Sequence, residues 1–148
     1  MPTSESRVVI RRTIAATPEE VFAAWTDAAT MGLWMRPGST SASRVELDVR
    51  VGGAFTIDMM HGERVHVHRG EYLEIDPPHL LVFSWISDGT QQERSIVRVE
   101  LHARGEETEL VLTHERLPSE DAEKSHRRGW TDIVEALALR LERGHSAD

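Results

Sequence analysis

Histidines and carboxylates are the side chains of this sequence whose types and spacing could do chemistry. His66 and His68 alternate, so on a β-strand both rings would lie on one face, and His61 lies just across a glycine turn. Imidazoles at this spacing can chelate zinc or iron. A cupin-type site also needs a carboxylate at a set distance, and here Glu71 comes too early and Glu74 too late. We therefore predict no metal site and no other cofactor, and we interpret the three histidines as part of a solvated hairpin.

Acid–base chemistry is the second option. Asp58, His114, Glu123 and His126 would all reach an interior cavity if their strands and helix face inward. We expect the His114 ring to point inward, either as a buried histidine with one polar partner or as a contact to a ligand. Nucleophilic catalysis is not indicated, because the chain has no cysteine and no Gly-x-Ser-x-Gly turn. No catalytic residue is predicted, since no complete catalytic set is present.

The aromatic and methionine side chains suggest a binding site instead. Four tryptophans in 148 residues exceed what filling a core of this size demands. We hypothesise a hollow in which methionines supply adaptable contacts and indole N–H groups orient a small apolar or aromatic ligand. The predicted ligand-binding residues are Trp34, Met35, Phe55, Met59, Trp85, His114, His126, Trp130 and Val134.

Helix and strand signals begin at the N-terminus. Residues 7–14 read as a first strand. Thr17 then offers a helix N-cap, with Pro18 at the first helical position and Glu20 three residues after the cap. Asp27 could cap a second short helix. The sequence thus predicts two short helices directly after the first strand.

From about residue 44 to 115 the hydrophobic period changes from helical to two, which is typical of β-strands. Turn residues separate the runs too closely for the helical crossovers that parallel strands require. An antiparallel meander of six strands is predicted. Its turns are expected at Gly52-Gly53, His61-Gly62, Asp76-Pro77-Pro78, Asp88-Gly89 and Arg104-Gly105.

A long final helix is predicted from its cap at Ser119 to a stop at Gly144, about 25 residues in all. Toward the N-terminus its apolar stripe continues into His126 and Glu123. Either these first turns overhang the sheet in water, or the stripe passes from sealed core to the mouth of a cavity. The sealed part of the stripe consists of Trp130, Ile133, Val134, Leu137 and Leu141.

Composition bounds the remaining possibilities. The chain is predicted to form a single domain over residues 1–148, with an ordered core of about 7–144. A net charge of −8 argues against nucleic acid and anionic membranes as partners. The sequence has neither a signal peptide nor 18 consecutive apolar residues, so no membrane insertion and a cytoplasmic location are predicted. The edge strands of a meander can pair with those of a second copy of the chain, so a homodimer is one partner arrangement that the sequence allows.

Several motifs carry a family resemblance from about Val8 to Leu141: Thr17-Pro18-Glu19-Glu20-Val21-Phe22, Val51-Gly52-Gly53-Ala54-Phe55, Gly70-Glu71-Tyr72-Leu73-Glu74, Leu81-Val82-Phe83-Ser84-Trp85, Thr113-His114-Glu115-Arg116 and Gly129-Trp130. With the order of elements, they resemble the START-like (SRPBCC) superfamily. The similar branch is the C-terminal domain of the activator of the heat-shock protein 90 ATPase, in its stand-alone bacterial members.

The resemblance implies an α+β helix-grip fold, with a curved antiparallel sheet of about seven strands and a long C-terminal helix over it. It also implies a cavity between that helix and the sheet for a small hydrophobic ligand. Two alternatives stay open: a polyketide cyclase or dehydratase that uses a histidine or carboxylate of the pocket, and a chaperone activator or other protein-interaction role. We favour a binding protein over an enzyme.

Overall fold

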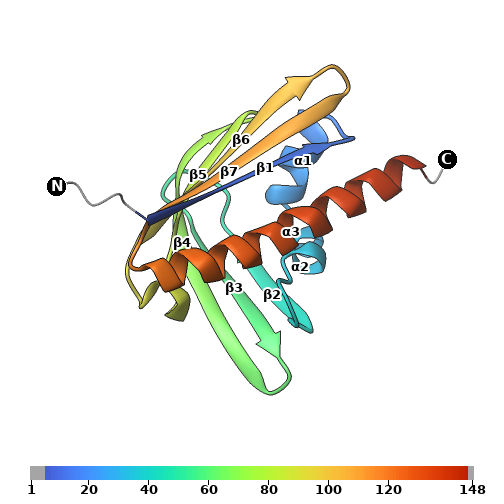
Figure 1. The fold of residues 1–148 in the computed structure, drawn as a ribbon. Coiled ribbons are helices and arrows are strands. Elements are labelled where there is room, and N and C mark those ends of the chain that lie inside the picture. Colours follow the sequence, from blue (N-terminus) through green and yellow to red (C-terminus); the bar gives the residue numbers. More distant parts are fainter. Residues whose placement is uncertain (1–5, 147–148) are drawn as a thin grey trace.

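The structure, a computed structural model, describes residues 6–146. A seven-stranded antiparallel sheet carries two short helices near one end and a long C-terminal helix along one face (Figure 1). The predicted α+β helix-grip fold is confirmed. The elements are β1 (Ser6–Ile14), α1 (Pro18–Trp25), α2 (Ala28–Trp34), β2 (Ala42–Leu47), β3 (Ala54–His61), β4 (Arg64–Asp76), β5 (Leu80–Trp85), the short 3₁₀ helix η1 (Asp88–Thr90), β6 (Ser95–Arg104), β7 (Glu107–Leu117) and α3 (Glu120–Ser146).

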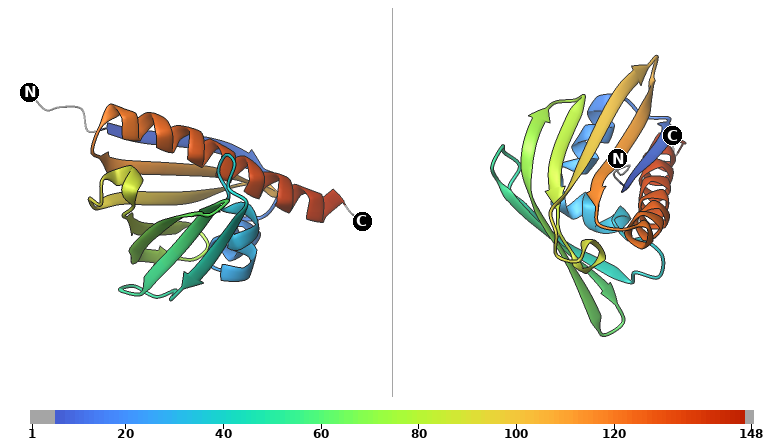
Figure 2. Two further views of the ribbon diagram at one scale, coloured as in Figure 1. Left: turned by 90° about the horizontal axis from the view of Figure 1, so that it is seen from below. Right: turned by 60° about the vertical axis from the view of Figure 1, so that its left-hand side comes forward.

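Strands β2 to β7 form the predicted six-stranded meander, and the first strand, β1, adds to its last strand. Strands β2 to β7 pair with their neighbours in sequence, whereas β1 pairs with β7 at the far edge. Gly62 and Gly105 turn the chain with φ of 62° and 64°, which glycine adopts without a Cβ clash. The sheet curves around α3, and α1 and α2 lie in the connection between the two edge strands (Figure 2).

The start of α1 is held by the predicted capping box. The backbone N–H of Glu20 donates to the Thr17 side chain (3.2 Å), and the Glu20 carboxylate accepts from the Thr17 backbone N–H (3.0 Å). Asp27 is the N-cap residue of α2, but its side chain makes no capping hydrogen bond to the backbone. It accepts instead from the hydroxyl of Thr30 (2.6 Å).

The long helix α3 begins as predicted and ends later. The side chain of Ser119 accepts a hydrogen bond from the backbone N–H of Ala122 (3.1 Å), which caps the helix. The predicted stop at Gly144 is wrong, because the helix continues to Ser146. Glycine ends a helix where the backbone turns to positive φ, and Gly144 does not adopt that conformation.

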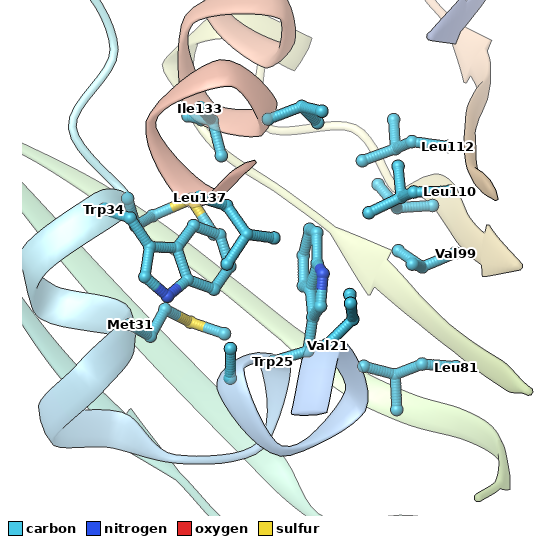
Figure 3. Packing of buried hydrophobic residues seen from close by; sticks show 14 of the residues in the cluster. Val21, Trp25, Met31, Trp34, Leu81, Val99, Leu110, Leu112, Ile133 and Leu137 are labelled. Carbon is cyan, nitrogen blue, oxygen red and sulfur yellow. The ribbon is translucent and has the colours of Figure 1, made fainter. Parts of the chain in front are cut away.

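The centre of the core is an aromatic cluster with almost no free space. The indoles of Trp25 in α1 and Trp34 in α2 meet edge-on, with ring centroids 4.8 Å apart. Ile133 and Leu137 of α3 belong to the same cluster (Figure 3). The void left beside Trp25 is about 10 Å³, roughly what one water molecule needs. Any binding site must therefore lie away from this centre.

Among the residues that the structure describes, no helix is both long and apolar enough to cross a membrane. The longest helix, α3, has an acidic first turn containing Glu120, Asp121 and Glu123. The negative charges of these carboxylates interact favourably with the positive N-terminal end of the helix dipole, which stabilises the start of α3.

Candidate binding cavity

A cavity of about 440 Å³ opens to solvent between the N-terminal half of α3 and the β3–β4 hairpin. This volume lies in the range of small-molecule sites. Its walls are dominated by imidazole and indole rings, namely His61, His66, His68, His126, Trp85 and Trp130. The cavity is thus an aromatic pocket beside the sealed core rather than a hollow through the centre of the protein.

The register of the β3–β4 hairpin places its histidines on this wall. Met59 opposes His66 across the two strands, and directly opposed residues share a face of the sheet. Val65 and Val67 lie on the other face, where they are 52% and 50% exposed. The prediction of a solvated hairpin is therefore wrong for the histidines, which are half-buried, while the valines between them face the solvent.

His61 fastens the segment before β2 to the hairpin through both ring nitrogens. The Thr40 hydroxyl donates to the carbonyl oxygen of Pro37 (2.6 Å), so it accepts from His61 Nε2 (3.1 Å). The Ser39 hydroxyl lies 3.2 Å from His61 Nδ1 and donates to it. His61 consequently has no ring nitrogen left for a ligand.

His68 and His126 each use one ring nitrogen and keep the other. Nδ1 of His68 lies 3.2 Å from the carbonyl oxygen of Ile57, and Nδ1 of His126 lies 2.7 Å from that of Ala122. A carbonyl oxygen only accepts, so both Nδ1 atoms carry a proton. Burial lowers the pKa of His68 to about 4 and lowers the pKa of His126 as well. Both rings are therefore neutral at neutral pH, with a lone pair on Nε2.

A buried hydrogen-bond chain supports the cavity wall from behind. The indole N–H of Trp130 donates to Nδ1 of His114 (2.9 Å). Nε2 of His114 then carries the proton and donates to the Ser95 hydroxyl (2.7 Å), which donates to the carbonyl oxygen of Trp85 (2.6 Å). His114 is 0% exposed. This chain ties the Trp130 indole to the backbone of Trp85 and uses the N–H group of Trp130.

His114 makes the stability of the protein depend on pH. Burial, followed by repulsion from the nearby His126, lowers the pKa of His114 well below 6.5. Below pH 6.5 the unfolded chain therefore binds a proton that the folded chain does not, and the folded state loses stability as the pH falls toward the folded pKa. We expect the free energy of unfolding in urea to drop from pH 7.5 to pH 5.5 by on the order of 1 kcal/mol from this ring. His68 and His126, whose pKa values burial also lowers, add to the drop with the same sign.

The exposed histidine of β6 supplies the control for this measurement. His102→Asn removes an imidazole that lies on the surface, so this variant should show the same drop between the two pH values. A free energy of unfolding that stays constant from pH 7.5 to pH 5.5 would contradict the neutral, buried state of His114.

The structure brings together some of the predicted ligand-binding residues and separates others. Met59, Trp85, His126 and Trp130 line the cavity. His114 lies behind the wall. The remaining predicted residues are buried in the closed core, away from the cavity: Trp34, Met35, Phe55 and Val134.

The indole N–H groups do not serve the cavity as expected. Nε1 of Trp34 and Nε1 of Trp85 are buried without a hydrogen-bond partner and without access to solvent. Trp130 uses its N–H group for His114. The groups that can orient a ligand by hydrogen bonding are thus the imidazoles rather than the indoles.

Of the acid–base candidates, only His126 reaches the cavity. Glu123 pairs with Arg127 at the surface (3.4 Å), and Asp58 opposes Val67, whose side chain faces solvent. The carboxylate on the cavity wall is Asp88, an exposed residue that accepts a hydrogen bond from Gln92 (2.7 Å).

Sequence reasoning also missed the small residues of the wall, because they lie in the loops and on the helix face beside the rings. They include Pro37, Ser87, Gly89, Ser125 and Gly129. No set of three or more His, Asp or Glu side chains within residues 6–146 is arranged to hold a metal ion.

The family assignment rests on the match of residues 15–142 to the family described as activator of Hsp90 ATPase homolog 1-like protein. This match spans most of the chain. The protein belongs to the activator of Hsp90 ATPase homolog 1-like family. The resemblance to this branch is therefore confirmed. No functionally curated protein matches the sequence significantly.

Solved structures share the fold of this family member. A Chromobacterium violaceum protein is 22% identical, with a TM-score of 0.82 over 93% of this chain and 97% of the other. An HSP90 activator from Plasmodium falciparum is 28% identical, with a TM-score of 0.75 over 93% and 96%. A Rhizobium loti protein is 27% identical, with a TM-score of 0.76 over 93% and 97%.

Proposed function

We propose that this protein binds a small hydrophobic or aromatic molecule in the cavity between α3 and the β3–β4 hairpin. The observation that carries the proposal is the cavity of about 440 Å³ walled by the rings of Trp85, Trp130 and the histidines. Aromatic walls give a flat ligand both apolar contact and stacking partners. The cavity lies beside a core that is already filled, so a ligand does not have to displace core side chains.

The wall is also held in place before a ligand arrives. Trp130 is anchored through His114 and Ser95, and the loop at Pro37 is anchored through Thr40 and His61. A preformed site loses less conformational entropy on binding than one that must be ordered by its ligand. This favours a binding protein over a surface that assembles on demand.

We expect sterols, fatty acids or aromatic polyketides to change the intrinsic tryptophan fluorescence as they fill the cavity, since Trp85 and Trp130 line it. Calorimetric titration of the same panel would give the affinities. Gly129→Leu tests the location, because a Cβ at this position meets only Pro37, at 3.7 Å, and a longer side chain enters the cavity. Binding should weaken at least about tenfold.

The matched control for this variant is Gly144→Leu in the same helix, where an added Cβ meets nothing within 4 Å. Both substitutions replace glycine with a better helix former, so neither should destabilise the helix. A fluorescence signal that is flat across the whole panel, or equal binding by both variants, would be incompatible with the proposed cavity site.

A chaperone-related role is the second candidate. The supporting observation is the 28% identity to the HSP90 activator of Plasmodium falciparum, over nearly the full length of both chains. The ATPase rate of an Hsp90-type chaperone, measured with and without this protein, distinguishes the two functions. If the Gly129→Leu variant still stimulates the chaperone's ATPase, this would favour the chaperone role over ligand binding.

An enzyme of the cyclase or dehydratase kind is the third possibility. His126 and Asp88 line the same cavity, which is the arrangement such chemistry would start from. Among the hydrogen bonds and ion pairs of the described residues, however, none joins the two side chains, and Asp88 bonds to Gln92. Binding without turnover is therefore the function that the site supports best.

A further inference from the structure

We propose that the ligand of this cavity is a hydroxylated aromatic molecule, whose phenolic hydroxyl donates a hydrogen bond to Nε2 of His68 or His126. This inference rests on the proposed function and specifies the chemistry of the ligand. It follows from which polar atoms the cavity offers and which it withholds.

The two acceptors are defined by their hydrogen bonds on the opposite side of each ring. Nδ1 of His68 and Nδ1 of His126 are committed to the carbonyl oxygens of Ile57 and Ala122. Nε2 of His126 has no hydrogen-bond partner among the described residues, and neither Nε2 atom is among the buried polar atoms sealed from solvent. Since both rings line the cavity, these lone pairs are accessible to a molecule inside it.

Most ring N–H groups of the cavity wall are unavailable to a ligand, which leaves the His66 ring and the Ser125 hydroxyl as side-chain donors. The N–H group of Trp130 is used by His114, and that of Trp85 is sealed from solvent. Both nitrogens of His61 are occupied by hydroxyl groups. A ligand that carries only acceptors would thus leave the imidazole lone pairs unpaired. A hydroxyl group can donate to one lone pair and also accept from a donor such as the Ser125 hydroxyl.

The aromatic rings of the cavity wall determine what kind of molecule can carry the hydroxyl group. His68 packs on Trp85 with ring centroids 5.0 Å apart, and Trp130 lies 5.1 Å from Trp85. Such a surface suits a flat aromatic body. The protein carries a net charge of −8, and this disfavours an anionic ligand relative to a neutral phenol.

The test compares 2-naphthol with 2-methoxynaphthalene, which has the same ring system but no hydroxyl hydrogen. We expect the intact protein to bind 2-naphthol about tenfold more tightly, as one hydrogen bond to a partly buried acceptor predicts. Calorimetry supplies both dissociation constants. Binding of naphthalene itself reports whether the cavity takes aromatic molecules at all.

The double variant His68→Asn/His126→Asn assigns the selectivity to the two rings. Asparagine can keep an N–H group near the position of Nδ1 and has no atom at the position of Nε2. In the double variant, 2-naphthol and 2-methoxynaphthalene should bind with about equal affinity, while naphthalene still binds. His102→Asn, at an exposed position of β6, should leave the preference unchanged.

Gly89→Ala is a second variant that keeps both histidines. A Cβ at Gly89 would lie 3.1 Å from Cε1 and 3.4 Å from Nε2 of His126, so it should crowd this acceptor and weaken 2-naphthol more than naphthalene. Equal affinity of the intact protein for 2-naphthol and 2-methoxynaphthalene would overturn the inference and leave the cavity function standing. Failure of all three compounds to bind would overturn both.

Discussion

Replacing Trp25 with alanine is expected to lower the free energy of unfolding by about 3–5 kcal/mol, because it removes a fully buried indole at the centre of the core. Trp25 is 1% exposed and contacts the rings of Trp34, Phe83 and Trp130. The void beside it is only about 10 Å³, so the loss of the indole creates a new cavity. Urea unfolding monitored by circular dichroism measures the change.

Two comparisons separate the effect of volume from other effects. Nε1 of Trp25 is buried without a hydrogen-bond partner, so Trp25→Phe removes an unsatisfied N–H group along with a modest volume and should cost less than about 1.5 kcal/mol. Leu33→Ala changes a side chain that is 49% exposed, so we expect a change within about 0.5 kcal/mol. Equal losses for Trp25→Ala and Leu33→Ala would show that the aromatic cluster is not the core.

Gly70→Ala is expected to be the second most damaging substitution, with a loss of about 3 kcal/mol or more in the free energy of unfolding. A Cβ at Gly70 would lie 1.9 Å from the backbone oxygen of Ser84 and 2.6 Å from Cζ of Phe55. The backbone of β5 cannot yield as a flexible side chain would, so the strands must separate. Thermal unfolding of the variant measures the loss.

Gly144→Ala is the matched control for Gly70→Ala. An added Cβ at Gly144 meets nothing within 4 Å, and the residue lies inside helix α3. Alanine is the better helix former, so this variant should gain up to about 1 kcal/mol. Opposite signs for the same chemical change would show that close approach of the backbone at Gly70, not the loss of glycine flexibility, causes the damage.

Part of the cavity wall could have been predicted from the turn expected at His61-Gly62. A two-residue loop at Gly62 and Glu63 pairs His61 with Arg64, and the same register pairs Met59 with His66. Met59 was expected to face inward, so His66 had to share its face. The hairpin histidines were instead predicted to be solvated once a metal site was rejected, because this register was not used to place them.

Other parts of the site could not be predicted from the sequence. Trp34 and Phe55 have the residue type and the strand or helix position of a cavity wall, yet both are buried in the closed core. Whether an inward-facing ring fills the core or borders a cavity depends on the distance between the layers at that point. No periodicity in the sequence encodes that distance.

The sequence by itself determined the architecture of this protein: the strand period, the capped helices and the glycine turns are local signals, and each acts over a few residues. Its motifs also pointed to the correct family. Only the tertiary structure decided where the free space lies and which atoms face it. His68 and His126 come from a strand and a helix far apart in the chain, and their free lone pairs follow from hydrogen bonds that exist only once the chain has folded.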